Sequence, residues 1–234
     1  MAVKSLGKTP IVVLIGGGSK LPPLIKAAQS PKNNFKISLV VTHKRNSPGI
    51  DYALKHNIPA VFFNLTDYRT RLHKEPNNAR KSYAELLGWF ISQKEYAPKL
   101  LVFAGWDLIM DNNFFKFFKS DIGNGYSAIN IHPALMKTKF EKDKVKLPND
   151  SSIPVIKGEQ QEVLETVLRE KHSYFGPSVH FMNPNNFDEG TVITREFIKV
   201  GNSKTPEDLR KKLMPVEDKI LISAINIAIS KFLK

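Results

Sequence analysis

Cysteine is absent from the 234-residue chain. Disulfide bonds and chemistry that depends on a thiolate are therefore excluded, and the composition fits a reducing compartment such as the cytoplasm. Most structural zinc patterns also fail without cysteine. The six histidines show no spacing typical of metal ligands, so we expect no metal: His43, His56, His73, His132, His172 and His180.

Long apolar runs and early acidic residues are also missing. No run approaches the roughly 20 apolar residues that cross a bilayer, and the nearest, residues 220–229, is interrupted by Ser223 and Asn226. Residues 1–50 contain no Asp or Glu, and the net charge is +13. This excess could be a solvated lysine surface, attract small anionic ligands or bind nucleic acid. We expect no membrane partner, and nucleic acid is disfavoured because the lysines follow no ribonucleoprotein pattern.

Short apolar stretches rich in β-branched residues alternate with segments of helical periodicity. The stretches 11–15, 35–42, 59–63, 100–104 and 127–133 are typical of buried strands. Such alternation predicts an α/β fold with a doubly wound, Rossmann-like, mostly parallel sheet of about seven strands. Residues 176–182 and 190–200 predict an antiparallel pair of strands near the C-terminal side.

Two stretches break this alternation. Residues 64–78 are polar and predict an irregular connection. Residues 137–156 form a lysine-rich insertion, which is long for a loop inside a compact domain. Helices are expected over residues 48–56 with Ser47 as the N-cap, over 78–96 with Asn78 as the cap, and over 157–171. The last helix begins after Thr205. Residues 1–10 are expected to be a short tail, and we see no domain boundary.

The strand predicted at 127–133 carries two polar side chains among apolar ones. Residues two apart in a strand point to the same face, so Asn130 and His132 would project side by side. Pro133 interrupts the ladder, which places both at the end of a strand, where open α/β sheets bind ligands. An amide and an imidazole are suitable donors for an oxyanion. Taken alone, the pair could equally satisfy neighbouring backbone groups in the core.

A glycine-rich turn follows the first predicted strand. The sequence Gly16-Gly17-Gly18-Ser19-Lys20-Leu21 leads into a helix that contains Pro22 and Pro23. Strand, glycine turn and helix together are typical of phosphate binding, because glycines let the backbone approach the anion. The spacing matches neither a dinucleotide fingerprint nor a P-loop, which favours a single terminal phosphate. The alternative is a tight turn without a ligand.

The order of these motifs resembles one family along about 200 residues, namely phosphoribosylglycinamide formyltransferase (GAR transformylase) within the formyltransferase-fold group. The resemblance is carried by the glycine-rich turn and by four further motifs: Ala104-Gly105-Trp106, Ile129-Asn130-Ile131-His132-Pro133, Ser178-Val179-His180-Phe181 and Phe187-Asp188-Glu189-Gly190.

The resemblance implies roles for individual residues. Asn130, His132 and Asp188 would be the catalytic trio. One set of residues would bind the ribonucleotide substrate, with its phosphate at the turn: Gly17, Gly18, Ser19, Lys20, Arg80, Glu217 and His180. Another set would form a wall of the folate pocket: Trp106, Asp107, Leu108, Ile109 and Met110.

The resemblance also implies an activity. A single formyltransferase domain over residues 1–234 would transfer the formyl group of 10-formyltetrahydrofolate to glycinamide ribonucleotide in purine (IMP) biosynthesis. It would be a cytoplasmic transferase of one-carbon metabolism, with small-molecule partners and a monomeric or homodimeric state. Alternatives are another folate-dependent formyltransferase or formyltetrahydrofolate hydrolase of the same fold, or a non-catalytic module that binds phosphate or RNA.

Overall fold

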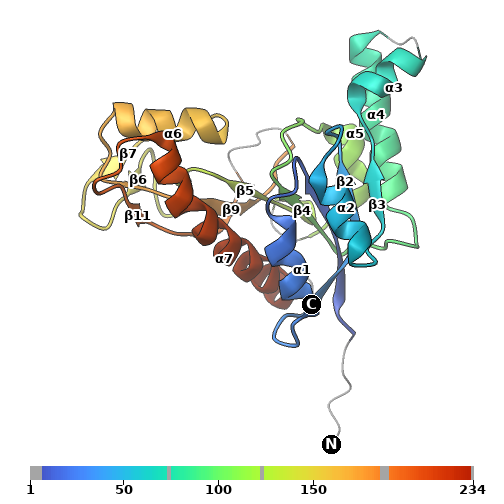
Figure 1. Ribbon diagram of the computed structural model, residues 1–234, viewed down its shortest axis with the longest axis horizontal. Helices are drawn as coiled ribbons and strands as arrows, with labels where there is room; N and C mark the ends of the chain where they lie inside the picture. The colour runs from blue at the N-terminus through green and yellow to red at the C-terminus, as the bar shows by residue number, and fades with distance from the viewer. Residues whose placement is uncertain (1–6, 73–74, 122–123, 185–189, 233–234) are drawn as a thin grey trace, which may run out of the picture. The chain divides into compact units, whose positions relative to one another are not determined.

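The computed structural model describes residues 7–72, 75–121, 124–184 and 190–232. The chain divides into two compact units. Unit 1 comprises residues 1–119 and 228–234, and unit 2 comprises residues 120–227. Figure 1 labels the helices and strands along the chain.

The strands of unit 1 are parallel and pair in the order β4-β1-β2-β3. They are β1 (Thr9–Ile15), β2 (Phe35–Thr42), β3 (Ala60–Phe62) and β4 (Leu100–Ala104). Residues 11–15 of β1 are all 0% exposed. Such uninterrupted burial is typical of a parallel strand covered on both faces, and it explains why β1, β2 and β4 are continuous apolar runs in the sequence.

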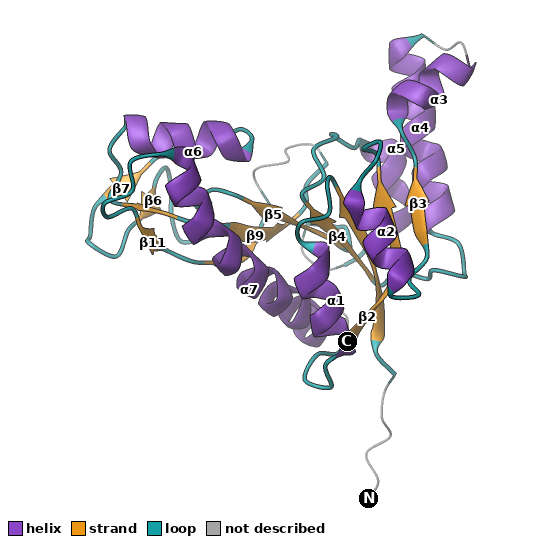
Figure 2. Ribbon diagram, in the orientation of Figure 1, coloured by secondary structure: helices purple, strands orange, loops and turns teal. Residues whose placement is uncertain are grey.

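The helices of unit 1 are α1 (Leu21–Gln29), α2 (Pro48–Lys55), α3 (Leu65–Leu72), α4 (Pro76–Ile91) and α5 (Asn112–Phe115), followed by the 3-10 helix η1 (Lys116–Phe118). Helices α1 and α2 contact β2, and α4 contacts α3 and α5 (Figure 2). The prediction of an irregular segment over 64–78 was wrong, because α3 is a helix without a buried side chain and so lacks an apolar stripe. Likewise, α4 has Glu75 at its N-cap rather than Asn78.

The main strands of unit 2 are antiparallel and pair in the order β10-β9-β5. They are β5 (Ala128–His132), β9 (Ser178–Phe181) and β10 (Val192–Arg195). Two short pairs accompany them: β6 (Val145–Lys146) with β7 (Ser152–Ile153), and β8 (Tyr174–Phe175) with β11 (Ile198–Lys199). Helix α6 (Gln160–Arg169) and residues 206–227 of α7 (Pro206–Phe232) complete this unit.

The main strands of the described residues are thus four parallel strands in unit 1 and three antiparallel strands in unit 2. This confirms the predicted α/β class and the antiparallel strands near the C-terminal side. The single strand expected over 190–200 is wrong in detail, because β10 and β11 are separate and β11 pairs with β8.

The lysine-rich insertion contains regular structure. Strands β6 and β7 form an antiparallel pair whose buried residues join a small apolar cluster of Leu135, Val145, Leu147 and Ile153. Glu141 accepts hydrogen bonds from the Lys146 backbone at 2.6 Å and from the Thr138 backbone at 2.8 Å. Arg195 of β10 forms an ion pair with Glu141 at 2.6 Å. Both side chains are largely buried, so a buried ion pair holds the insertion against β10.

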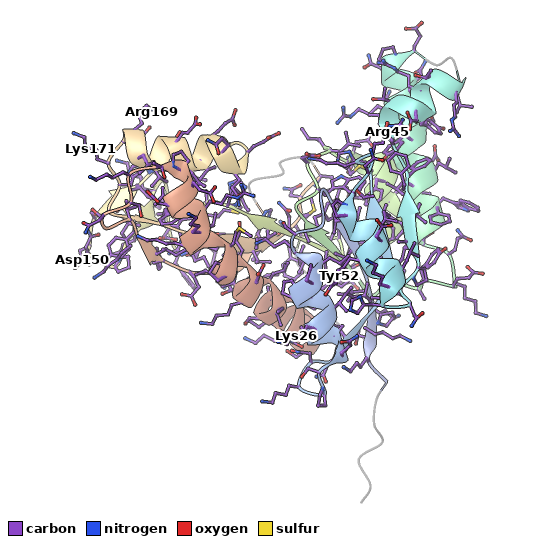
Figure 3. All side chains as sticks on the ribbon, viewed as in Figure 1. Lys26, Arg45, Tyr52, Asp150, Arg169 and Lys171 are labelled. Carbon is purple, nitrogen blue, oxygen red and sulfur yellow. The ribbon has the colours of Figure 1, made fainter. Side chains whose placement is uncertain are left out.

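Charged side chains are distributed over the surfaces of both units. In unit 1, Lys26 and Arg45 are exposed; in unit 2, Asp150 is exposed beside the β6–β7 pair, and Lys171 is exposed beyond the end of α6 (Figure 3). Within the described residues, no helix has the length and apolar character needed to cross a membrane.

Candidate active site

Strand β5 presents Asn130 and His132 two residues apart in unit 2. Asn130 is partly exposed and His132 is 5% exposed, while the intervening Ile131 is buried. Alternate residues of a strand share a face, so Asn130 and His132 lie on one face of β5, and the buried Ile129 and Ile131 lie on the other. Pro133 follows directly after the last strand residue.

The amide of Asn130 faces the ring of His180 on the neighbouring strand. These residues are paired in the antiparallel register of β5 and β9, and Asn130 Nδ2 lies 3.5 Å from His180 Nε2. His180 is 0% exposed, and its Nδ1 lies 2.9 Å from the Phe181 carbonyl oxygen. Since a carbonyl only accepts, Nδ1 carries the ring proton, and Nε2 of the neutral ring accepts from the amide. Thus one N–H of Asn130 is directed at His180, and the amide retains a second N–H.

His132 is held by the segment that follows the lysine-rich insertion. Its Nε2 lies 3.3 Å from the carbonyl oxygen of Ile156, so this nitrogen carries a proton and donates. Ile156 is buried in an apolar cluster with Val163 and Val167 of α6. The packing of α6 therefore helps to fix the backbone group that His132 contacts.

Glu217 is a buried acidic residue of α7. It is 3% exposed, and its Oε1 accepts a hydrogen bond from Gln160 Nε2 at 3.2 Å. Gln160 is the first residue of α6, so this contact joins the two helices of unit 2. A carboxylate kept in such a place can accept hydrogen bonds from sugar hydroxyl groups.

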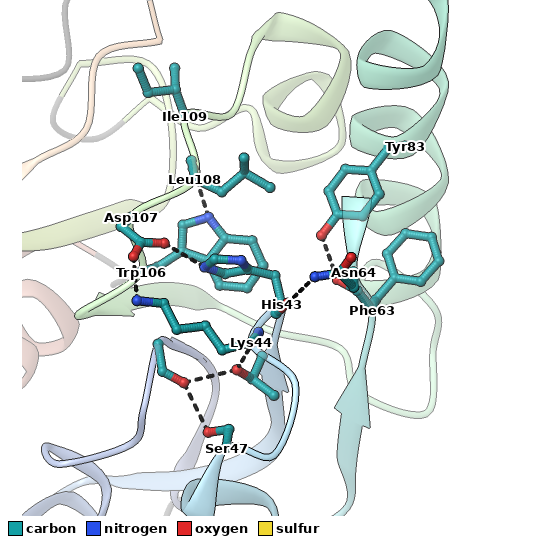
Figure 4. A network of polar contacts seen from close by, with 12 residues as sticks. His43, Lys44, Ser47, Phe63, Asn64, Tyr83, Trp106, Asp107, Leu108 and Ile109 are labelled. Carbon is teal, nitrogen blue, oxygen red and sulfur yellow. Dashed lines mark hydrogen bonds and ion pairs between the residues drawn. The ribbon is translucent and has the colours of Figure 1, made fainter. Parts of the chain in front are cut away.

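The glycine-rich turn lies between β1 and α1 in unit 1. Gly18 has φ +93°, and a Cβ at this position would lie 2.7 Å from Gly49 Cα. The carbonyl oxygen of Gly16 accepts hydrogen bonds from the hydroxyls of Thr42 and Ser47, both at 2.9 Å. Ser47 was predicted as the N-cap of α2 and occupies that position, but its hydroxyl binds Gly16 instead of capping the helix (Figure 4).

The segment 106–110 follows β4 and has two buried side chains. Trp106 is 8% exposed and Met110 is 1% exposed, whereas Ile109 is 61% exposed. Trp106 Nε1 donates to the Leu108 carbonyl oxygen at 2.7 Å, which folds the segment back on itself. Arg80 of α4 donates to the Ile109 carbonyl oxygen at 2.9 Å, so this predicted phosphate contact is directed at the segment.

A charged cluster joins the ends of β2 and β4. The carboxylate of Asp107 lies 2.6 Å from His43 Nε2 and 2.5 Å from Lys44 Nζ (Figure 4). The His43 ring also lies edge-on to Trp106, with 4.6 Å between ring centroids. The His43 contact is a close approach rather than a well-directed hydrogen bond, because within the described residues the buried Nε2 has no hydrogen-bond partner.

The pKa values of His43 and Asp107 are both lowered, but burial causes the shift of His43 and opposes the shift of Asp107. Burial lowers the pKa of His43 below its usual 6.5, and Lys44 lowers it further, while Asp107 opposes them. Burial would raise the pKa of Asp107, but Lys44 and His43 outweigh it and the pKa is lowered. At neutral pH the cluster therefore contains a neutral imidazole, a carboxylate and an ammonium group.

The sequence did not predict this cluster, although Asp107 had been assigned to a folate wall. His43 and Asp107 are far apart in the chain and lie in loops without periodicity. The one available signal is the order of the strands, since β4 and β2 both flank β1 and their carboxyl ends meet at one edge. Asp188 of the predicted trio lies outside the described residues. Among the residues that are described, no group of three or more His, Asp or Glu could hold a metal ion.

Comparison with known families identifies the chain. The family described as formyl transferase matches residues 9–225, nearly the whole length. The chain belongs to the formyl transferase family.

Curated relatives of this formyl transferase have low sequence identity but long coverage. This chain is 28% identical over 222 residues to phosphoribosylglycinamide formyltransferase of Dictyostelium discoideum, and the match covers 94% of this chain and 97% of that protein. It is 24% identical over 214 residues to the chloroplastic phosphoribosylglycinamide formyltransferase of Arabidopsis thaliana, covering 92% of the chain but 63% of that protein. The chain thus spans less than two thirds of the Arabidopsis relative.

Solved structures agree on the fold of the formyl transferase. Glycinamide ribonucleotide transformylase 1 from Symbiobacterium toebii superposes with a TM-score of 0.74 at 21% identity, covering 97% of this chain and 90% of that one. Phosphoribosylglycinamide formyltransferase from Coxiella burnetii gives 0.71 at 24% identity, covering 94% and 86%. In a formyl transferase, the donors of Asn130 and His132 are chemically suited to an acyl-transfer oxyanion.

Proposed function

We propose that this formyl transferase transfers the formyl group of 10-formyltetrahydrofolate to the amine of glycinamide ribonucleotide, a step of purine (IMP) biosynthesis. The observation that carries the proposal is the pair on β5, where the Asn130 amide faces His180 at 3.5 Å and the His132 imidazole follows two residues later. The names of the relatives point to the same substrate. The two acceptors that must be distinguished are an amine and water.

The proposed reaction is direct acyl transfer. The substrate amine attacks the formyl carbon, and the carbonyl oxygen becomes an oxyanion. Asn130 donates its second N–H to this oxygen, and His132 in its charged form donates another hydrogen bond. When the intermediate collapses, the bond from carbon to the folate nitrogen breaks and the new amide bond remains. The proton lost by the amine is gained by the folate nitrogen, so the step is balanced without a covalent enzyme intermediate.

Asp188 has a supporting role in this proposal. An adjacent carboxylate would raise the pKa of His132 and favour the charged form, and it could orient a water that carries the proton. No metal is required for any of these steps. His180 is placed here as a positioning residue for Asn130, since it is completely buried, rather than as a group that touches substrate.

The remaining predicted residues divide between substrate and co-substrate. Gly17, Gly18, Ser19 and Lys20 would bind the phosphate, Arg80 would add a second phosphate contact, and Glu217 would hold the ribose hydroxyls. Trp106 to Met110 would form a wall for the folate. In this proposal the protein acts as one formyltransferase domain, in the cytoplasm, as a monomer or a homodimer.

A spectrophotometric assay of folate deformylation, with and without glycinamide ribonucleotide, tests this function. Deformylation that depends on the ribonucleotide is the expected result. Equal rates without it would replace the proposal with a hydrolase of the same fold. Absence of turnover under both conditions would reject both enzymes and direct attention to other amine acceptors or to binding.

A further inference from the structure

Lys44 lies beside the glycine-rich turn of unit 1. A Cβ at Gly16 would be 3.5 Å from Lys44 Cε, so the end of this lysine side chain is next to the backbone of the turn. The Lys44 backbone N–H donates to Thr42 Oγ1 at 3.1 Å, and the same hydroxyl donates to the Gly16 carbonyl oxygen at 2.9 Å. A single threonine hydroxyl therefore connects the backbones of both segments (Figure 4).

The Lys44 ammonium is held but not buried. It contacts Asp107 Oδ2 at 2.5 Å, and 46% of its side chain is exposed. An ammonium has three N–H donors, and the carboxylate engages one. Asp107 is itself shared with His43, so its position is fixed from two directions. The ammonium can therefore donate to an anion at the turn while it keeps its contact with Asp107.

We propose that Lys44 donates directly to the phosphomonoester bound at the glycine-rich turn, and that Asp107 is the positioning residue that holds the ammonium there. The inference rests on the proposed function, in which residues 17–20 bind the substrate phosphate. Backbone N–H groups at such a turn provide shape and partial charge, and a lysine supplies a full compensating charge as a compact point source. The rival role is purely structural, with Lys44 joining the ends of β2 and β4.

The two roles differ in how they respond to substitution. Calorimetric titration with ribose 5-phosphate measures phosphate affinity without formyl transfer. Lys44→Met is expected to raise the Kd about tenfold, a typical loss for one charge-assisted contact. Lys44→Arg is expected to restore most of the affinity. Lys36→Met is the matched control, because Lys36 is an exposed lysine near the opposite end of the same strand, and its Kd should not change.

Steady-state kinetics complete the test. In Lys44→Met, KM for glycinamide ribonucleotide should rise by more than kcat falls. An unchanged Kd and KM in Lys44→Met would overturn the inference while leaving the proposed function in place. A loss that Lys44→Arg does not restore, accompanied by a lower melting temperature in both variants, would assign the structural role instead. Wild-type protein that neither binds ribose 5-phosphate nor turns over the ribonucleotide would overturn the inference and the proposed function together.

Discussion

The side-chain amide of Asn130 lies 3.5 Å from Nε2 of His180, across the antiparallel pairing of β5 and β9. The backbone carbonyl of Phe181 fixes the tautomer of the histidine, which in turn makes it an acceptor toward the amide. A fully buried ring thus sets the orientation of a partly exposed amide.

Replacing His180 with Phe should disturb Asn130 without emptying the core. The aromatic ring keeps much of the volume but cannot accept from the amide. We expect kcat to fall about tenfold with a small change in KM, since an oriented donor to the transition state is weakened. The side-chain amide resonances of Asn130 in 15N-correlated NMR spectra should shift. Unshifted resonances would contradict the positioning role.

Replacing His132 with Ala should remove one oxyanion donor. The expected loss in kcat is about 100- to 1000-fold, as for single donors in other acyl-transfer sites. His56→Ala is a control, because His56 follows the end of α2 and its ring packs on the same helix, with Nδ1 2.8 Å from the Tyr52 carbonyl oxygen. Normal turnover in His132→Ala would show that the role was assigned to the wrong residue.

Replacing Glu141 with Gln should lower stability in a pH-dependent way. Burial alone would raise the pKa of the Glu141 carboxyl, but donors on Arg195, Thr138 and Lys146 outweigh it and lower the pKa to about 2. Because the pKa is lower in the folded protein than in the unfolded chain, the ionised carboxylate stabilises the fold at pH values above about 4.5. This contribution is lost as the pH falls from 4.5 toward 2.

At pH 7 the free energy of unfolding of the Glu141→Gln variant should therefore be about 2 kcal/mol lower than that of the wild type, mainly because the Arg195 charge loses its partner. Chemical denaturation at several pH values measures the difference, which should shrink toward pH 2. A constant difference across this range would mean that the ion pair does not stabilise the insertion.

Gly18 and Gly17 provide a matched pair of substitutions. Gly18→Ala places a methyl 2.7 Å from Gly49 Cα at φ +93°, whereas nothing lies within 4 Å of a Cβ at Gly17. We expect Gly18→Ala to reduce the free energy of unfolding by about 1–3 kcal/mol, since an L-residue is strained in this conformation. Gly17→Ala should have a melting temperature close to that of the wild type. Equal melting temperatures for both variants would show that the turn rearranges freely.

The titration of His43 should respond in opposite directions to its two charged neighbours. Its pKa should lie below 6.5 in the wild type, because burial and Lys44 disfavour the imidazolium. Asp107→Asn should lower this pKa further and Lys44→Met should raise it. Histidine ring protons followed by NMR across pH give each value. Because the folded pKa is depressed, protonation below 6.5 should also weaken the fold.

Parts of this fold could be predicted because their signals are local. The ranges of β2 and β4 match the predicted 35–42 and 100–104, since a strand buried on both faces is a continuous apolar run. The side-by-side placement of Asn130 and His132 followed from the period of a strand. In contrast, α3 has no buried residue, so its sequence carries no apolar stripe to detect.

The less predictable parts of the site depend on contacts between distant segments. The Asp107 contacts with His43 and Lys44 form only because β2 and β4 flank β1, and neither loop has a periodic pattern. The regular structure of the insertion could not be predicted for a similar reason, because its strands contain two residues each and Arg195, which pairs with Glu141, comes from β10.

The turn of the β6–β7 pair is also a suitable site for a fluorescent label. Ser151 and Asn149 are exposed between its two strands, and the flanking Val145 and Ile153 are buried in their own cluster. Because the chain contains no cysteine, Ser151→Cys would introduce the sole thiol in the molecule. A maleimide dye would then attach at one defined position, and its fluorescence would report on the surroundings of the insertion during turnover without any background labelling to remove.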